Sequence, residues 1–245
     1  MKLVYAATIS TLLVILFGIL IISPMYLQPH TEKKQPQLML SFSIVESNPV
    51  NVWCQDLAAI LANHSVAATV FFVGNVAEQN PECVTIFGNN VDIGSQTYSN
   101  IDLTSISDYD TLLEEIRKGK NSVDNAGNLD SKSFRAPLGA TDQNIYSLLS
   151  RNGILADFSY ENQYNIFQNG QFIKIDIESY NWPEIPSDLL SGNYEYSKPI
   201  ILYLDNSVPT FEIENLVTKL ELSDLEIVSA SQLAGTELTI RGDSQ

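Results

Sequence analysis

Hydrophobic residues follow two kinds of pattern along the chain. Continuous apolar runs such as 38–45 (LMLSFSIV) and 66–74 (VAATVFFVG) are typical of strands that are buried on both faces of a parallel sheet. Segments such as 50–64 and 108–126 instead place apolar residues three and four positions apart, which predicts amphipathic helices. The two kinds of segment alternate along the sequence, so the chain predicts an α/β fold.

The alternation gives a list of expected elements. Strands, some with an adjoining loop or turn, are expected at 38–45, 66–74, 91–96, 131–140, 154–160, 171–177, 199–207 and 224–233. Helices are expected at 50–64, 75–90, 104–126 (with Ser107 or Asp108 as its cap), 141–153 (with Thr141 as its cap) and 211–221. A strand about every 25–30 residues favours parallel βαβ units, and about seven of them favour a distorted (β/α) barrel.

This barrel is expected to form a single domain over residues 38–235, followed by a C-terminal tail at 236–245. In barrels of parallel strands, the working site lies where the carboxyl ends of the strands open into loops. The stretches that fall at such ends are 43–46, 95–100, 135–139, 157–160 and 204–206. A functional site is therefore expected among them.

The N-terminal segment has a different character. Residues 3–23 carry no charge over 21 positions, which is long enough for a helix to cross a hydrocarbon core about 30 Å thick. A cleavable signal peptide has a shorter apolar region of about 7–15 residues. We therefore expect one transmembrane helix within residues 1–24, a tether at 25–37, and a single-pass membrane protein whose domain lies outside the cytoplasm.

Charge and cysteine content narrow the function classes. The chain has a net charge of −16, and removing Lys2, Glu32, Lys33 and Lys34 leaves 10 basic and 28 acidic residues, a net of −18. Such a surface repels nucleic acid and favours neutral partners such as sugar polymers, although it also serves solubility alone. The two cysteines, Cys54 and Cys83, form either one disulfide or two buried thiols.

Five stretches follow one another in an order that resembles a known family. They are 41–45 (SFSIV), 68–74 (ATVFFVG), 94–100 (GSQTYSN), 135–139 (RAPLG) and 202–205 (LYLD). They resemble the motifs T-F-D-D-G, A-T-F-F-V-x-G, G-x-H-T-x-x-H, R-x-P-x-G and L-x-H-D of the polysaccharide deacetylases, the NodB-like fold of carbohydrate esterase family 4. The fourth family motif has no clear counterpart, and Asp157 lies in roughly its region.

The general base, the general acid and the three metal ligands of that family are all replaced in this chain. The resemblance places Ser43 at the general base, Leu204 at the general acid, and Ile44, Gln96 and Asn100 at the three metal ligands. A hydrocarbon side chain and two neutral amides are poor ligands for zinc, iron or cobalt. The matched positions that keep the family residue are Arg135, Pro137, Gly139, Leu202 and Asp205.

The resemblance therefore implies a degenerate family member, a pseudoenzyme with no expected metal cofactor and no assigned catalytic residue. Its implied partner is a cell-surface glycan. Two alternatives stay open. One is an active hydrolase of carbon–nitrogen bonds in carbohydrate N-acetyl groups, with a divalent metal in a rearranged site for which the available carboxylates are Asp92, Asp102, Asp157 and Asp205. The other is a structural or partner-binding module of the cell envelope.

The residues expected to line a substrate groove are Arg135, Pro137, Asp157, Tyr98, Tyr203 and Asp205, with Tyr160 and Trp182 as further aromatic candidates. Arg135 has two interpretations: an ion pair with Asp205 or Asp157, or contact with a bound sugar carboxylate or hydroxyl. Glycan binding predicts aromatic side chains in an open cleft, catalysis predicts a titratable group beside Ser43, and a structural role predicts a cleft filled by its own side chains.

Overall fold

The structure is a computed structural model that describes residues 35–45, 49–139, 141–191 and 197–242. These residues belong to one compact unit, Gln35–Gln245. The transmembrane helix expected at 3–23 lies outside the described residues, as does most of the tether. Within the part of the chain that is described, no helix is both long and apolar enough to cross a membrane.

Ten strands form one sheet, whose main path runs in the order β8-β7-β6-β5-β3-β2-β1-β10-β9, with β11 paired to β1. These strands are β1 (Gln37–Ile44), β2 (Ala68–Phe72), β3 (Val91–Ser95), β5 (Ser133–Phe134), β6 (Ala156–Asp157), β7 (Gln163–Gln168), β8 (Gln171–Asp176), β9 (Glu178–Asn181), β10 (Ile200–Asp205) and β11 (Glu226–Val228). The path begins at β8 and ends at β9, and Ile177 alone separates these two strands in sequence. The sheet therefore curls into a nearly closed barrel, as the alternating pattern predicts.

The sheet has more strands than the seven or so expected, and the reason is a hairpin. Strands β7 and β8 pair antiparallel, and β7 also pairs antiparallel with β6, while the other strand pairs of the sheet are parallel. Asn169 and Gly170 connect the hairpin, with φ values of 52° and 84°. An Asn-Gly pair favours this two-residue turn because both residues accept positive φ. The strand expected at 171–177 is correct, but its partner β7 and the following β9 were missed.

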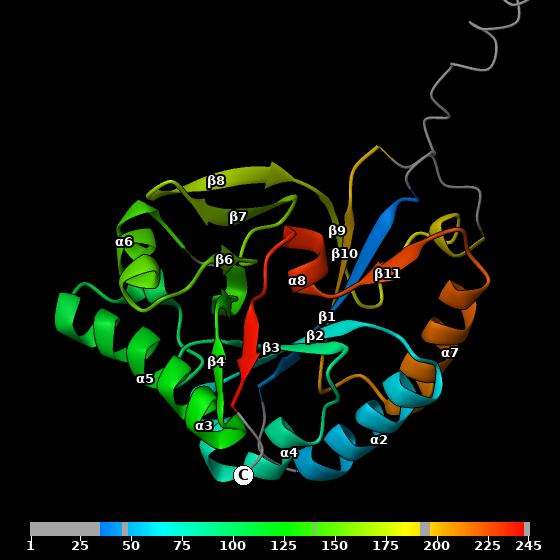
Figure 1. The fold of residues 1–245 in the computed structure, drawn as a ribbon, viewed down its shortest axis with the longest axis horizontal. Coiled ribbons are helices and arrows are strands. Elements are labelled where there is room, and N and C mark those ends of the chain that lie inside the picture. The colour runs from blue at the N-terminus through cyan, green and yellow to red at the C-terminus, as the bar shows by residue number, and fades with distance from the viewer. Residues whose placement is uncertain (1–34, 46–48, 140, 192–196, 243–245) are drawn as a thin grey trace, which may run out of the picture. The chain divides into compact units, whose positions relative to one another are not determined.

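Most of the helices flank the barrel in an arc, and the short helix α8 (Ala230–Ala234) lies at the centre of the view (Figure 1). The other α-helices are α2 (Val50–Asn63), α3 (Gly74–Gln79), α4 (Pro81–Thr85), α5 (Tyr109–Gly127), α6 (Gln143–Arg151) and α7 (Thr210–Glu221). The single helix expected at 75–90 is two helices, because Pro81 starts a new one and restricts the backbone of Asn80 before it. The cap of α6 is Asp142 rather than Thr141, since its carboxylate accepts from the amides of Asn144 and Ile145.

Successive residues of β1 face opposite sides of the sheet, and this alternation decides where the site lies. Leu38, Leu40, Phe42 and Ile44 belong to the large core cluster between the strands and helices α2 and α7. Met39 belongs to the second cluster, together with Phe71, Phe158 and Tyr203, which fills the barrel interior. Period-two alternation places Ser41 and Ser43 on that same inner face.

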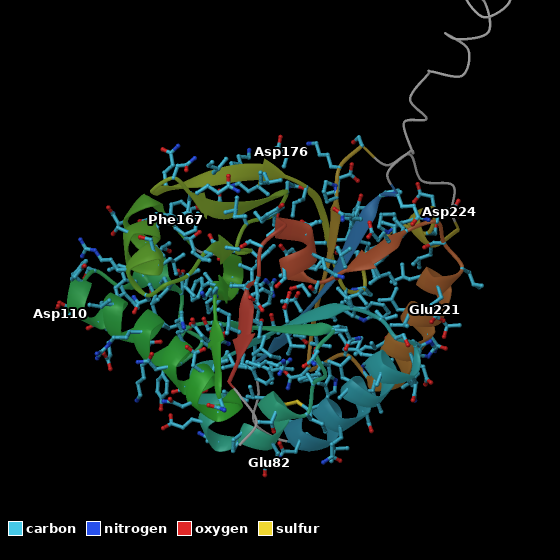
Figure 2. All side chains as sticks on the ribbon, in the orientation of Figure 1. Glu82, Asp110, Phe167, Asp176, Glu221 and Asp224 are labelled. Carbon is cyan, nitrogen blue, oxygen red and sulfur yellow. A yellow bond between two sulfur atoms is a disulfide. The ribbon has the colours of Figure 1, made fainter. Side chains whose placement is uncertain are left out.

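Cys54 of α2 and Cys83 of α4 form a disulfide, drawn as the yellow bond in Figure 2. Of the two alternatives left open by the sequence, the structure has the bonded one. Acidic side chains labelled in the same figure, among them Glu82, Asp110 and Glu221, lie at the periphery of the fold. The negative charge thus lies where water solvates it.

The C-terminal segment is part of the domain. Strand β12 (Thr239–Arg241) pairs antiparallel with β4 (Leu129–Ser131), and the Thr239 hydroxyl exchanges hydrogen bonds of 2.9 and 3.0 Å with the backbone of Ile93. The boundary expected at residue 235 is therefore too early. Because this segment is short and mostly polar, its sequence has no apolar run to indicate a strand.

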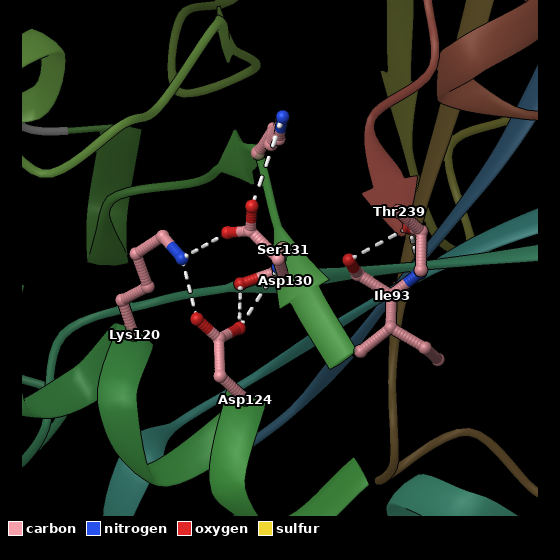
Figure 3. A network of polar contacts seen from close by, with 7 residues as sticks. Ile93, Lys120, Asp124, Asp130, Ser131 and Thr239 are labelled. Atoms are coloured by element: carbon pink, nitrogen blue, oxygen red, sulfur yellow. Dashed lines mark hydrogen bonds and ion pairs between the residues drawn. The ribbon is translucent and has the colours of Figure 1, made fainter. Parts of the chain in front are cut away.

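A partly buried ionic network ties α5 to β4 beside this segment (Figure 3). The Lys120 ammonium group donates to Asp124 and, at 2.7 Å, to Asp130. The other oxygen of Asp124 accepts from the amide and hydroxyl of Ser131 at 2.9 and 2.6 Å. Each charge in the network thus has an opposite charge or hydrogen-bond donor beside it, as buried charges require.

Candidate functional site

A cavity of about 390 Å³ opens at the carboxyl ends of the parallel strands. Its lining residues follow β1, β3, β5, β9 and β10: Ser43, Val45, Gln96, Asn100, Arg135, Ala136, Pro137, Leu138, Asn181, Trp182, Tyr203, Leu204, Asp205, Ser207 and Val208. Four of the five stretches expected to meet at this face therefore do meet there. The stretch 157–160 does not line the cavity.

Backbone hydrogen bonds between neighbouring strand ends hold the lining in place. The amide of Arg135 donates to the carbonyl of Ser95 at 3.1 Å, and the amide of Trp182 donates to the carbonyl of Tyr203 at 3.0 Å. Asn206 closes the gap between β1 and β10, since its amide donates to Ser43 and its side-chain oxygen accepts from the Val45 amide at 3.0 Å. A site carried on strand ends in this way is rigid and preorganised.

Arg135 is the only lysine or arginine among the lining residues. Its guanidinium carbon lies 4.1 Å from the centroid of the Tyr203 ring, and its Nη1 donates a hydrogen bond to the Ser43 hydroxyl. Burial lowers the pKa of Arg135 from its ordinary value, whereas Tyr203 and Asp205 act in the opposite direction. Arginine nevertheless stays charged, because its pKa starts above about 12.

The ion pair expected between Arg135 and Asp205 or Asp157 is not formed. No carboxylate among the described residues makes an ion pair with Arg135. Asp205 lines the same cavity, but its Oδ1 accepts from the amide of Ser207 at 2.8 Å and from the hydroxyl of that residue. Asp157 is buried behind the cavity wall.

Asp157 supports the loop that carries Arg135. It is fully buried, and burial raises its pKa to about 7, against the opposing effect of hydrogen bonds from Ser159. The Ser159 hydroxyl donates to Asp157 and accepts from the amide of Ala136 at 2.8 Å. Asp157 is thus no groove residue, contrary to expectation. In the same loop, Gly139 has φ +68°, and a Cβ there would lie 2.6 Å from the Ser159 carbonyl oxygen.

The aromatic candidates divide into two groups. Tyr203 and Trp182 line the cavity, although the Tyr203 hydroxyl turns inward to the carbonyl of Phe158 at 3.2 Å, and burial raises its pKa to about 12. Tyr98 lies outside, where its hydroxyl donates to Glu78 and the ammonium of Lys118 lies 3.6 Å from its ring centroid. Tyr160 also lies outside, since it is absent from the lining and donates to a loop carbonyl.

The positions that the resemblance assigns to catalysis lie in two places. Ser43, Gln96, Asn100 and Leu204 line the cavity. Ile44 does not, because its side chain is fully buried on the opposite face of β1, in the core beneath the helices. Leu204 is 3% exposed and belongs to the same core cluster.

These residues do not fit a divalent metal of the kind that the resemblance implies. Gln96 and Asn100 offer neutral amide oxygens, and Ile44 offers no donor atom. The carboxylates considered for a rearranged site are also apart: Asp92 accepts from the Ser231 amide at 2.6 Å, and Asp102 caps a short 3₁₀ turn. Within the described part of the chain, no three His, Cys, Asp or Glu side chains are grouped so as to hold a metal ion.

Three carboxamides contribute to the polar lining, beside two serines, one arginine and one aspartate. The side chains of Gln96, Asn100 and Asn181 make no hydrogen bond to any described residue, although Gln96 is only 2% exposed. Asn181 was not predicted, because it ends a strand, β9, that the hydrophobic pattern did not reveal. Asp205 is the register partner of Ser43 on β10 and lines the same cavity, so the site presents hydrogen-bond donors and acceptors together with one carboxylate.

Comparisons with known proteins identify a matching family and solved structures with a similar fold. The sequence profile of the polysaccharide deacetylase family matches residues 30–156. A search of curated protein sequences gives no match. Among solved structures, BA3943 from Bacillus anthracis, a pseudoenzyme of carbohydrate esterase family 4, is 16% identical over 82% of this chain and 66% of its own, with a TM-score of 0.60.

Two further structures are similar. A mutant of the peptidoglycan deacetylase PdaC from Bacillus subtilis is 17% identical, over 82% of this chain and 90% of its own, with a TM-score of 0.59. A family 4 carbohydrate esterase from Streptomyces lividans is 18% identical, over 85% and 98%, with a TM-score of 0.59. At this identity the structures establish the fold, and the profile match, which spans just over half of the sequence, establishes that the chain belongs to the polysaccharide deacetylase family.

Proposed function

We propose that this chain is a non-catalytic member of its family that binds a cell-surface glycan in the cavity at the strand ends. The proposal also keeps the single membrane anchor at residues 3–23, with the domain outside the cytoplasm. The observation that carries it is the set of three carboxamides, Gln96, Asn100 and Asn181, that line an open cavity without hydrogen-bond partners among the described residues. Sugar hydroxyls are suited to such groups, because both donate and accept.

The aromatic content of the cavity supports the same proposal. Trp182 is half-buried, packs on the main core and lines both this cavity and an adjoining pocket with Ile185, Leu190 and Lys219. An indole ring held in this way offers a rigid apolar face at little entropic cost. A glycan longer than one sugar would run from the cavity across Trp182 into the adjoining pocket.

Catalysis of the family type is disfavoured by the chemistry of the side chains. Hydrolysis of an N-acetyl group requires an activated water and a stabilised oxyanion, which a bound metal supplies by lowering the pKa of the water and polarising the carbonyl. Ser43 has Arg135 as its side-chain partner, and an arginine cannot act as its base. The alternative of an active hydrolase therefore depends on Asp205, the carboxylate at a matched position in the cavity lining, or on groups outside the matched positions.

The structural-module alternative predicts a filled cleft. Leu204 and Ile44 do share one core cluster, so part of the former site is packed for stability. The remaining cavity of about 390 Å³ is nevertheless within the range of about 300–1,000 Å³ typical of small-ligand sites. The similarity to BA3943, a pseudoenzyme of carbohydrate esterase family 4, gives a precedent for a pseudoenzyme with this fold.

The experiment that tests the proposal is a titration of the full chain, purified in non-ionic detergent, with oligomers of N-acetylglucosamine in the presence of zinc. We expect binding without release of acetate, and at least tenfold weaker binding by Trp182→Ala, about 1.4 kcal/mol. Phe211→Ala is the matched control, because Phe211 is an exposed aromatic residue on α7 outside the cavity lining.

The outcomes separate the three functions. Acetate release that is abolished by a chelator would establish the hydrolase. No binding of this glycan, or of other neutral and acidic oligosaccharides, would favour the structural module. The anchor is tested independently by membrane fractionation and protease accessibility of intact cells, where we expect the domain in the membrane fraction and open to external protease.

A further inference from the structure

Arg135 makes no ion pair with the described residues around it, and Asp205 acts on its charge only at longer range. Its one side-chain hydrogen bond goes to a neutral hydroxyl, that of Ser43, and its Nε is buried without any partner. No carboxylate among the described residues pairs with it. A buried cation in this situation is costly, and it gains free energy from any carboxylate that reaches it.

The sequence explains how this state arises. By the family resemblance, position 43 is the general base, an aspartate, and here Ser43 is shorter and uncharged. The guanidinium is still held in the same wall of the cavity by its stack on Tyr203, 4.1 Å away. The substitution at position 43 therefore removes one carboxylate from the cavity wall and leaves Asp205 as the carboxylate among the lining residues.

We propose that the cavity recognises a carboxylate carried by the glycan, such as that of a hexuronate residue, through Arg135, with Ser43 beside it. This inference rests on the proposed function, because it specifies the class of glycan bound at the same site. Guanidinium groups bind carboxylates strongly, since charge-assisted hydrogen bonds are shorter and roughly twice as strong as neutral ones. Gln96 and Asn100 supply neutral donors on the same cavity.

The negative charge of Asp205 opposes the binding of a ligand carboxylate at Arg135, and this opposition can be tested. It lines the same cavity, and its charge acts on Arg135 without forming an ion pair. A ligand carboxylate binds beside Arg135 against the repulsion of this second carboxylate and of the net negative charge of the domain. Removing the charge of Asp205 should therefore strengthen acid recognition, and adding a charge at Ser43 should abolish it.

The test compares one oligosaccharide in two forms. The probe is a tetrasaccharide in which glucuronate alternates with N-acetylglucosamine, and the control is its methyl ester, which lacks only the charge. Calorimetric titration of the full chain in detergent, in a buffer without carboxylates, should show at least tenfold tighter binding of the acid, about 1.4 kcal/mol. Arg135→Gln should remove this preference.

Two further variants keep the test informative if Arg135→Gln unfolds. Ser43→Asp places a carboxylate beside the arginine, so it should lose the preference for the acid while still binding the ester. Asp205→Asn keeps the oxygen that accepts from Ser207, and it should increase the preference for the acid. Ser43→Asp adds a negative charge to the cavity and Asp205→Asn removes one. The two variants should therefore shift the ratio of the affinities for the acid and for the ester in opposite directions.

Each remaining outcome overturns a specific statement. Equal affinity for acid and ester in the unmodified chain would overturn carboxylate recognition and leave the glycan proposal intact. Binding of neutral N-acetylglucosamine oligomers without binding of the glucuronate tetrasaccharide would also overturn carboxylate recognition and leave the glycan proposal intact. Free glucuronate or acetate binding as tightly as the tetrasaccharide would assign the site to a small carboxylate and overturn the glycan. No binding of any of these probes would overturn both proposals.

Discussion

Replacing Ile44 by aspartate would restore the residue type of a family metal ligand. The structure predicts that this substitution instead lowers the stability of the fold. Ile44 is fully buried in the core between β1 and the helices and does not line the cavity. Burying such a side chain is worth about 1.5–3 kcal/mol. With the cost of the space left behind, truncation of a buried isoleucine to alanine typically costs about 2–5 kcal/mol.

The charge of the new aspartate adds to this loss. Asp157 shows what burial does to a carboxyl in this protein, since it raises the pKa from 3.8 to about 7. A similar shift of about three units at position 44 corresponds to roughly 4 kcal/mol, because each unit is worth about 1.4 kcal/mol. A group whose pKa is raised in the folded state loses its stabilising contribution as the pH rises from the unfolded value through the folded one.

The assay is urea unfolding at pH 5 and pH 8, with Ile44→Asn as the uncharged control of similar size and Ile44→Val as the mild one. We expect Ile44→Val to cost about 1 kcal/mol and Ile44→Asn several times more. Ile44→Asp should be less stable than Ile44→Asn at pH 8 by roughly 3–4 kcal/mol, with a smaller difference at pH 5. Unchanged stability of Ile44→Asp at pH 8, or a zinc-dependent rise in its melting temperature, would refute this reasoning.

Three other substitutions test separate parts of the account. Asp157→Asn should flatten the fall in unfolding free energy between pH 4 and 8, by up to about 1.4 kcal/mol per pH unit, as read by urea titrations. Lys120→Met should lower stability in the same assay by less than the about 3–5 kcal/mol typical of a fully buried pair, because Asp124 keeps its hydrogen bonds from Ser131 and the half-exposed Asp130 keeps its ion pair with Lys132. Gly139→Ala should lower the melting temperature more than Gly153→Ala: both residues have positive φ, but only the first would press a Cβ on the Ser159 carbonyl.

The sequence was most informative where burial alone decides the structure. The apolar runs at 38–45 and 66–74 became β1 and β2, each buried along almost its whole length and paired in parallel. Because parallel strands end at the same edge, the stretches after them met at one cavity, as expected. The period of two along β1 also contained the information that Ser43 and Ile44 face opposite sides.

Other features depend on local turn chemistry that the hydrophobic pattern does not carry. The hairpin of β7 and β8 was indicated by Asn169-Gly170, a signal independent of apolar periodicity. The break between α3 and α4 was indicated by Pro81. The hydrogen-bond partner of Arg135 could not be predicted from the sequence. Three side chains that can accept a hydrogen bond, those of Ser43, Asp157 and Asp205, all lie near the carboxyl ends of strands, and only the directions of these side chains decide which one Arg135 contacts.

The central claim is that this family member binds glycan without deacetylating it. Saturation-transfer NMR of the full chain with oligomers of N-acetylglucosamine and zinc tests both halves in one sample, since bound sugar protons and the methyl signal of free acetate are resolved together. The account predicts saturation transfer to the sugar that Trp182→Ala weakens, with no acetate above the level of a protein-free sample. Acetate that accumulates and stops on addition of a chelator would contradict it.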